Sequence, residues 1–175
     1  RTFIQSRSEP LGPPANILKA LNHFFYDDLT QAELFVTLFY LQFQPETGRA
    51  SFASAGHSPP LLWKGAGRSL ERLDVEGLII GVYKDFPYQQ DELSLEPGDC
   101  LLLYTDGIIE AENADGEFFG EDRLAQLLLT SNQLSPQDLI DHIFDQVRLF
   151  TGQHNFQDDV SLVVMKLSET GVQSA

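Results

Sequence analysis

The sequence predicts an α+β fold in which helices pack on antiparallel sheets. Three observations lead to this class: an amphipathic helix pattern comes first, short apolar strands separated by turn residues follow, and two more helices precede a last strand. The chain has 175 residues with 42% hydrophobic content, which is enough for one domain with a sizeable core. We expect one domain over residues 1–168, followed by a disordered tail over 169–175.

The first predicted helix begins after the double proline at 13–14 and runs to about Leu29. Apolar residues recur there at three- and four-residue spacing, as they do on the buried face of a helix. This stripe consists of Ile17, Leu18, Leu21, Phe24 and Phe25. We expect the helix to cover a sheet with this face.

Two hairpins are predicted in the middle of the chain. The segment LFVTLFYLQFQ (34–44) is apolar at nearly every position, and a four-residue PETG turn separates it from RASFASA (49–55). The first of these two strands has the composition of a central strand. A second hairpin is expected to join QDELSLEPGD (90–99) to the apolar run LLLY (101–104). The short apolar pieces between the hairpins place strands only loosely.

Two helices and a strand complete the prediction. Leucines at helical spacing in FGEDRLAQLLLT (119–130) indicate the first helix. The second has Ser135 as its N-cap, Pro136 at its first position and Gly152 beyond its end. The β-branched segment QDDVSLVVMKL (157–167) is predicted to form the last strand.

Charge, hydropathy and cysteine content exclude several classes of protein. The net charge of −15 argues against a nucleic-acid backbone or an anionic membrane surface as the partner. No apolar run approaches the ~18 residues of a membrane span, and the first residues do not resemble a signal peptide. The single cysteine, Cys100, lies in an apolar strand pattern, where we expect a buried small hydrophobic residue. A cytoplasmic location is expected, since no internal disulfide can form.

Acidic residues stand at the ends of two predicted strands. Asp106 follows the apolar run 101–104, a position that suits a metal ligand, a general base or an Asp that hydrogen-bonds its own turn. Asp158 and Asp159 come directly before the last strand. If the two strands are antiparallel neighbours, the three acids meet at one end of a sheet, where Mg²⁺ or Mn²⁺ would offset their repulsion. Alternatively, Asp158 and Asp159 form a solvated turn.

Covalent catalysis and zinc chemistry have no motif in this sequence, which contains no G-x-S-x-G, H-E-x-x-H or C-x-x-C. His57, in ASAGHSPPLLW, occupies a turn followed by a double proline, and we expect a structural role for it. The other three histidines (His23, His142 and His154) are expected to be solvated or packed.

Three stretches, taken in this order, resemble the metal-dependent Ser/Thr protein phosphatases of the PPM type, specifically their bacterial sporulation and stress-response (SpoIIE-like) branch. They are FVTLFYLQFQPETGRASFASAGHSPPLL, LEPGDCLLLYTDGIIEAENADGEFFGEDRL and QDDVSLVVMKL, and the resemblance covers residues 15 to 167. It implies a four-layer α-β-β-α sandwich of antiparallel sheets with a two-metal site at one edge. There, Mn²⁺ or Mg²⁺ would activate a water for attack on phosphoserine or phosphothreonine, so no protein nucleophile is needed.

The resemblance also implies site residues, position by position. The Asp of YTDG is Asp106 and the metal-binding acid of the last pair is Asp158, so both are expected to be metal ligands. Asp159 is the next residue rather than a ligand. His57 matches an A-G-H turn of the family, for which no catalytic role is assigned.

One departure from the family pattern concerns the metal site. The family has an earlier G-D-x-x-G-H-G-like segment whose Asp bridges both metals, and this segment is absent here. The Gly98–Asp99 pair follows Pro97 in a turn that belongs to another part of the pattern. We therefore expect a domain truncated at its amino-terminal end, with weak metal affinity and poor turnover.

Two main functions remain open. The first is an enzyme acting on a small phosphoprotein, such as an anti-sigma-factor antagonist, under the control of an attached upstream sensor or receiver domain. The second is a phosphatase-like module that has lost catalysis and binds a regulatory partner, and an unrelated acidic binding domain is the third alternative. Sheet edges exposed by truncation also predict a homodimer.

Overall fold

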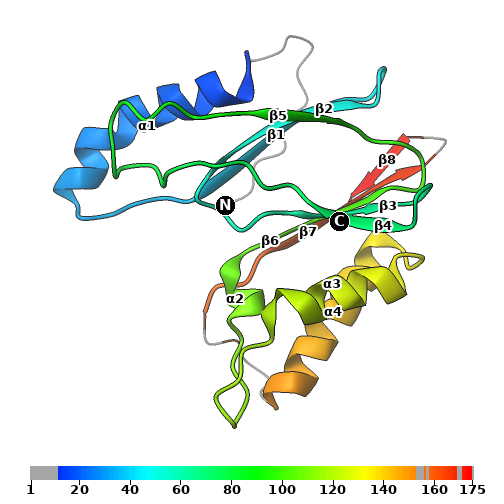
Figure 1. Ribbon diagram of the computed structural model, residues 1–175. Helices are drawn as coiled ribbons and strands as arrows, with labels where there is room; N and C mark the ends of the chain where they lie inside the picture. Colours follow the sequence, from blue (N-terminus) through cyan, green and yellow to red (C-terminus); the bar gives the residue numbers. More distant parts are fainter. Residues whose placement is uncertain (1–11, 153–155, 157, 169–170, 175) are drawn as a thin grey trace. The chain divides into compact units, whose positions relative to one another are not determined.

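The computed structural model describes residues 12–152, 156, 158–168 and 171–174, and it divides the chain into two compact units. The first unit comprises Arg1–Phe43, Arg49–His57 and Val75–Leu93. The second unit comprises Gln44–Gly48, Ser58–Asp74 and Ser94–Ala175. Figure 1 shows the elements of both units along the chain. The single domain expected over residues 1–168 stays a prediction.

The first unit contains helix α1 (Pro14–Gln31) and a three-stranded sheet in the order β1-β2-β5. Its strands are β1 (Leu38–Gln44), β2 (Arg49–Ala55) and β5 (Asp91–Ser94). The predicted β1–β2 pairing across a four-residue turn is confirmed. The prediction that β1 is central was wrong, because β2 is the middle strand of the described sheet. Four hydrophobic side chains of β2 are buried, whereas most of β1 is only half-buried. The four are Ala50, Phe52, Ala53 and Ala55.

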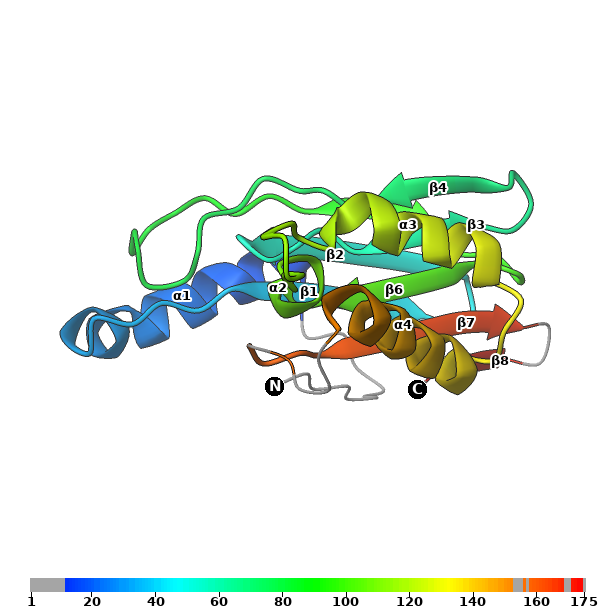
Figure 2. The ribbon, with the colours of Figure 1, turned by 90° about the horizontal axis from the view of Figure 1, so that it is seen from below.

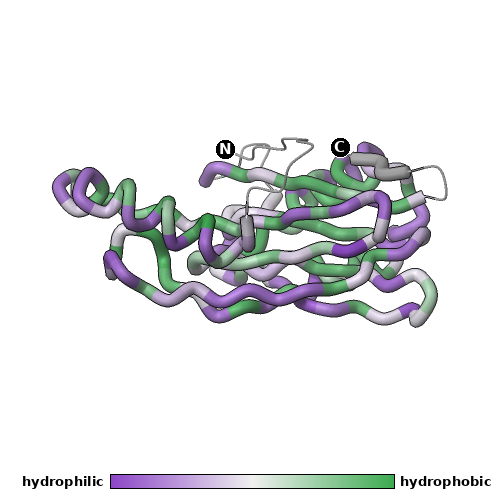
Figure 3. The backbone as a smooth tube through the Cα atoms, turned by 90° about the horizontal axis from the view of Figure 1, so that it is seen from above, coloured by the Kyte–Doolittle hydropathy of each residue, from purple (hydrophilic) through white to green (hydrophobic). Residues whose placement is uncertain are grey.

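Helix α1 packs on β2, but through a narrower stripe than the sequence predicts. Leu18 is fully buried and contributes to the core of the first unit. Phe24 is 74% exposed and Phe25 is 43% exposed, so the predicted inward position of these two rings was wrong. Figure 3 shows hydrophilic and hydrophobic positions mixed along this helix.

A buried polar residue explains part of this difference. The Asn22 side chain is fully buried and its Nδ2 donates to the carbonyl oxygens of Tyr83 (2.8 Å) and Lys84 (3.0 Å). Its Oδ1 accepts from the backbone N–H of Gly81 at 2.9 Å. The inward side of α1 therefore binds the 81–84 loop through an amide, which hydrophobic periodicity does not reveal.

The second unit contains helices α2, α3 and α4 and a five-stranded antiparallel sheet in the order β4-β3-β6-β7-β8. The strands are β3 (Leu61–Lys64), β4 (Ser69–Arg72), β6 (Cys100–Tyr104), β7 (Leu162–Ser168) and β8 (Gly171–Ser174). Figure 2 shows α3 and α4 side by side on this sheet, where α3 contacts β3 and α4 contacts β7. The predicted α+β class with antiparallel strands is confirmed.

The predicted hairpin of β5 and β6 was wrong. β5 pairs with β2 in the first unit, whereas β6 pairs with β3 and β7 in the second. Asp99, which is buried, accepts hydrogen bonds from Lys64 Nζ at 2.7 Å and from the Gly65 N–H at 3.0 Å. These bonds attach the turn before β6 to the end of β3, and so they favour the pairing of β6 with β3.

The carboxyl-terminal prediction needs a correction as well. Residues Gly171–Ser174 form β8, which pairs with β7, so the disordered tail expected over 169–175 does not describe these four residues. Residues 169, 170 and 175 lie outside the described residues. The interpretation of the tail as disordered relied on its polar composition, which does not exclude backbone pairing at a sheet edge.

Two of the helices agree closely with the sequence. These are α3 (Gly120–Ser131) and α4 (Pro136–Thr151). Ser135 caps α4 by accepting the Asp138 N–H at 3.2 Å, and Gly152 has the positive φ of 66° that often ends a helix. The core of the second unit includes the buried side chains of Leu124, Leu128, Leu139, Ile143 and Val147. Among the described residues, no helix has the length and apolarity needed to cross a membrane.

Cys100 belongs to this core and is 1% exposed, as the sequence predicts for a buried thiol. Burial raises the pKa of the thiol to about 11, from an ordinary value near 9. Between these values the thiol ionises in the unfolded chain while the folded chain keeps it neutral. The contribution of Cys100 to the free energy of unfolding is therefore fully present below pH 9 and is lost as the pH rises towards 11.

We expect the free energy of unfolding to fall by about 2 kcal/mol more in the unaltered chain than in Cys100→Ala between pH 8 and 11. Urea unfolding at several pH values measures this difference, and the comparison removes the contributions of tyrosines and lysines that titrate in the same range. Equal pH dependence in both chains would contradict the expectation.

Candidate metal centre

The pairing of β6 with β7 brings the sequence-predicted acids to one end of the second unit's sheet. Tyr104 on β6 lies opposite Leu162 on β7, and the two strands are antiparallel. Asp106 follows β6, whereas Asp158 and Asp159 precede β7. Since the carboxyl end of one antiparallel strand meets the amino end of its neighbour, the three acids belong to the same end of the sheet. The strand arrangement required by the sequence argument is therefore present.

Asp106 begins the short helix α2 (Asp106–Ile109), and its side chain is exposed. Its Oδ1 accepts the backbone N–H of Gly107 at 3.1 Å, and its carbonyl oxygen accepts the N–H of Glu110 at 2.8 Å. The turn interpretation of this residue is thus realised through Oδ1. Because Asp106 is exposed, the carboxylate is also accessible to a further partner.

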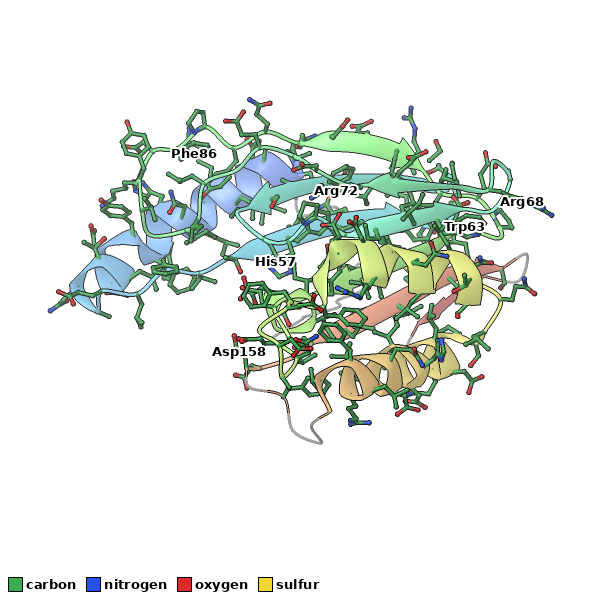
Figure 4. All side chains as sticks on the ribbon, turned by 60° about the horizontal axis from the view of Figure 1, so that its bottom comes forward. His57, Trp63, Arg68, Arg72, Phe86 and Asp158 are labelled. Carbon is green, nitrogen blue, oxygen red and sulfur yellow. The ribbon has the colours of Figure 1, made fainter. Side chains whose placement is uncertain are left out.

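Asp158 and Asp159 are both exposed, and Figure 4 places Asp158 close to the end of β7. The Oδ1 of Asp158 accepts the backbone N–H of Asp159 at 2.7 Å. The chain bends at Asp158, and both side chains are exposed, so the described structure is compatible with the solvated turn of the alternative interpretation. This turn is compatible with ligation, since the bond involves one oxygen of the carboxylate.

Thr105, which no sequence motif indicated, connects the two acidic segments. Its backbone N–H donates to the carbonyl oxygen of Ser161 at 3.1 Å. Its hydroxyl accepts the Ser161 N–H at 2.9 Å and donates to the carbonyl oxygen of Asp159 at 3.3 Å. A hydroxyl directly before the strand-end Asp was the signal that could have drawn attention to it.

Gly107 allows the two segments to approach closely. A Cβ at this position would lie 2.8 Å from the carbonyl oxygen of Asp159 and 3.2 Å from Cγ2 of Val160. The first of these distances is too short for a carbon–oxygen contact, so only glycine fits without a backbone shift. Because glycine has no side chain, α2 can pack closely against the residues that precede β7.

The end of β6 is also attached to α3 and β4. Tyr104 is buried, and its hydroxyl donates to Oε2 of Glu121 at 3.1 Å, while Oε1 of Glu121 lies 3.0 Å from Nε of Arg72. Burial, with a smaller contribution from the negative charge of Glu121, raises the pKa of Tyr104. The phenol stays protonated at neutral pH and donates to Glu121, which helps to hold the strand end just before Thr105.

The donor set fits a hard cation in kind but is incomplete in number. Asp106 and Asp158 supply carboxylate oxygens, which Mg²⁺ and Mn²⁺ prefer. Within the part of the chain that the structure describes, no group of three or more histidine, cysteine or acidic side chains could hold a metal ion. The assignment of Asp106 and Asp158 as metal ligands stays a prediction.

His57 belongs to the first unit, where its turn is held by neighbours of that unit. Its Nδ1 lies 3.2 Å from the Thr37 hydroxyl, and its backbone N–H donates to the Ser54 hydroxyl at 3.3 Å. These contacts fit the structural role expected from the sequence. His154 lies outside the described residues.

Comparisons with known proteins show which family and fold this chain resembles. The family model "Stage II sporulation protein E (SpoIIE)" matches residues 1–168. Phosphoserine phosphatase RsbU of Bacillus subtilis (strain 168) is 29% identical over 153 residues, which are 87% of this chain and 45% of RsbU. The chain thus spans less than half the length of this relative.

Two solved structures show the same fold. The SiaA-PP2C domain of Pseudomonas aeruginosa has a TM-score of 0.78 at 20% identity, covering 89% of this chain and 61% of that domain. The phosphatase domain of SpoIIE from Bacillus subtilis, presoaked with Mn, has a TM-score of 0.63 at 18% identity, covering 97% and 76%. These likenesses support the α+β sandwich predicted from the sequence. Because the family model matches nearly the whole chain, the chain belongs to the Stage II sporulation protein E (SpoIIE) family.

Proposed function

We propose that this chain is a metal-dependent phosphatase domain that hydrolyses phosphoserine or phosphothreonine on a small regulatory phosphoprotein. The observation that carries the proposal is the β6–β7 pairing, which assigns Asp106 and Asp158 to the same end of one sheet. Membership of the SpoIIE family and the likeness to a relative named as a phosphoserine phosphatase support the activity.

Asp106 and Asp158 would be ligands of Mn²⁺ or Mg²⁺, and the mechanism would use two ions in the complete domain. When bound, such ions supply an activated water and positive charge that stabilises the transferring phosphoryl group. The chain's own part is to present two carboxylates from the segments that follow β6 and precede β7. The Tyr104–Glu121 hydrogen bond and the Thr105 contacts hold the end of β6 and the residues before β7 in place.

The partners are inferred by analogy with the family. An anti-sigma-factor antagonist or a similar phosphoprotein is the proposed substrate, and an upstream sensor or receiver domain is the proposed regulator. A cytoplasmic location and a homodimer formed through sheet edges are part of the same proposal. The net charge of −15 supports a protein partner over a nucleic acid.

A second candidate function is supported by the incomplete ligand set. This function is a phosphatase-like module that binds a regulatory partner without catalysis, and it needs no cluster of three ligands, none of which is found within the described residues. Both acids would then serve their local turns, through the bonds from the Gly107 and Asp159 N–H groups. Metal binding distinguishes the two functions.

Isothermal titration with Mn²⁺ tests the proposal on the 175-residue chain. We expect weak binding, with a Kd of about 0.1–1 mM, because two carboxylates are fewer than a tight site needs. Asp106→Asn and Asp158→Asn should each weaken binding at least about tenfold, since each removes one charged ligand. Unchanged circular dichroism of the variants would show that folding is intact.

Asp159→Asn is the matched control, because it removes an equally exposed acid beside Asp158 that is not assigned as a ligand. It should bind Mn²⁺ as the unaltered chain does. Absence of binding, or binding that neither Asp106→Asn nor Asp158→Asn changes, would contradict the metal site and favour the binding module.

A further inference from the structure

Thr105 extends the contact between β6 and β7 beyond the last paired residues. The strand pairing ends at Tyr104 and Leu162. Past this point, three hydrogen bonds join Thr105 to the segment that precedes β7: two to Ser161 and one to Asp159. The backbone N–H supplies one of them, and the side-chain hydroxyl supplies the other two.

The hydroxyl makes these bonds in a complementary way. A threonine hydroxyl has one hydrogen to donate and lone pairs to accept. Here it accepts the Ser161 N–H at 2.9 Å and donates to the Asp159 carbonyl at 3.3 Å, so both backbone groups are bridged by a single atom. The position of residues 159–161 relative to residue 105 therefore depends on this oxygen. We call this arrangement the Thr105 clasp.

Each proposed ligand is the direct neighbour in the chain of a residue of the clasp. Thr105 directly precedes Asp106, and the clasped Asp159 directly follows Asp158, whose carboxylate accepts the Asp159 N–H at 2.7 Å. The close approach of Gly107 to the Asp159 carbonyl also restricts this segment. A shift of Asp159 would thus move Asp158 relative to Asp106.

We propose that Thr105 is a positioning residue whose hydroxyl sets the placement of Asp158 relative to Asp106 and thereby raises the affinity for a divalent cation. This inference rests on the proposed function, because it requires that both acids are ligands. Residues that orient metal ligands contribute to affinity without touching the ion, and their loss commonly costs about 10- to 100-fold in binding. Thr105 acts through the backbone of residues 159–161 rather than on the reacting atoms.

Thr105→Val tests the clasp, because valine keeps the branched shape and removes the hydroxyl. We expect the Mn²⁺ Kd from titration calorimetry to rise about 10- to 100-fold. Amide hydrogen exchange, followed by NMR without metal, should show faster exchange at Ser161, whose N–H loses its side-chain acceptor. Thr105→Ser keeps the hydroxyl and should retain both the affinity and the protection.

Thr130→Val is the matched control. The Thr130 hydroxyl also donates to backbone carbonyls, those of Gln126 and Leu127 in α3, but it takes no part in the clasp. This variant should bind Mn²⁺ as the unaltered chain does. If Thr105→Val fails to fold, Thr105→Ala removes the same hydroxyl without the branched methyl groups.

The outcomes separate this inference from the proposed function. Mn²⁺ binding that Asp106→Asn weakens but Thr105→Val leaves unchanged would overturn the positioning role and preserve the metal site. Equal loss of affinity in Thr105→Ser and Thr105→Val would also overturn it, because the hydroxyl would then not be the cause. No binding by the unaltered chain would overturn both proposals, whereas loss in Thr105→Val with retention in Thr105→Ser would support the clasp.

Discussion

Gly77→Ala is expected to lower the free energy of unfolding by about 3–5 kcal/mol, or to prevent folding. A Cβ on residue 77 would lie 1.7 Å from the carbonyl oxygen of Ser54 and 2.6 Å from its carbonyl carbon. These are backbone atoms of β2, the middle strand of the first unit's sheet, so they cannot turn aside as a flexible side chain does. Accommodation requires β2 or the 75–81 segment to move.

Urea unfolding followed by far-UV circular dichroism measures this loss. Gly67→Ala is the matched control, because a Cβ there would meet only the Ser69 hydroxyl at 3.4 Å, an ordinary contact. The control should stay within about 0.5 kcal/mol of the unaltered chain or gain slightly, since alanine restricts the unfolded state. A midpoint for Gly77→Ala equal to that of the control would contradict the expected clash.

The same unfolding curves also test the single domain predicted over residues 1–168. Trp63, the only tryptophan, lies in β3 of the second unit, whereas Gly77 lies in the first. Tryptophan fluorescence therefore reports on the second unit, and circular dichroism reports on both. Coincident transitions in Gly77→Ala would support one cooperative domain, and separate transitions would contradict it.

Gly107→Ala is expected to affect both stability and the proposed metal site. The new methyl group would lie 2.8 Å from the Asp159 carbonyl oxygen and 3.2 Å from Val160. Separating α2 from this segment should lower the free energy of unfolding by about 2–3 kcal/mol. Because Asp158 directly precedes the displaced carbonyl group, the Mn²⁺ Kd should also rise at least about tenfold.

Two measurements on one sample check this expectation: urea unfolding followed by Trp63 fluorescence, and Mn²⁺ titration under native conditions. Gly67→Ala again serves as the control for adding a methyl group without a clash. A Gly107→Ala chain that loses stability but keeps its Mn²⁺ affinity would show that residues 107 and 159 pack together without influencing the ligands. Unchanged stability would contradict the close approach itself.

Local sequence signals predicted α3 and α4, the β1–β2 turn and the strand ends that carry Asp106 and Asp158. α4 begins after Ser135 because the side chain of this residue caps a nearby backbone N–H, and it ends before Gly152 because that residue adopts a left-handed conformation. The strand-end acids were found because an apolar run that stops at a carboxylate is visible in a few consecutive residues. Such features depend on neighbours in the chain, so the sequence by itself determined them.

Contacts between distant segments were decided only by the tertiary structure. β5 and β6 belong to different sheets, and the turn before β6 is attached to the end of β3 by the bonds of Asp99 with Lys64 and Gly65, which lie far away in the sequence. The Thr105 clasp likewise joins residues more than 50 positions apart, and neither partner has an unusual residue type. Hydrogen-bond partners of this kind depend on which strands become neighbours, and hydrophobic periodicity does not specify that choice.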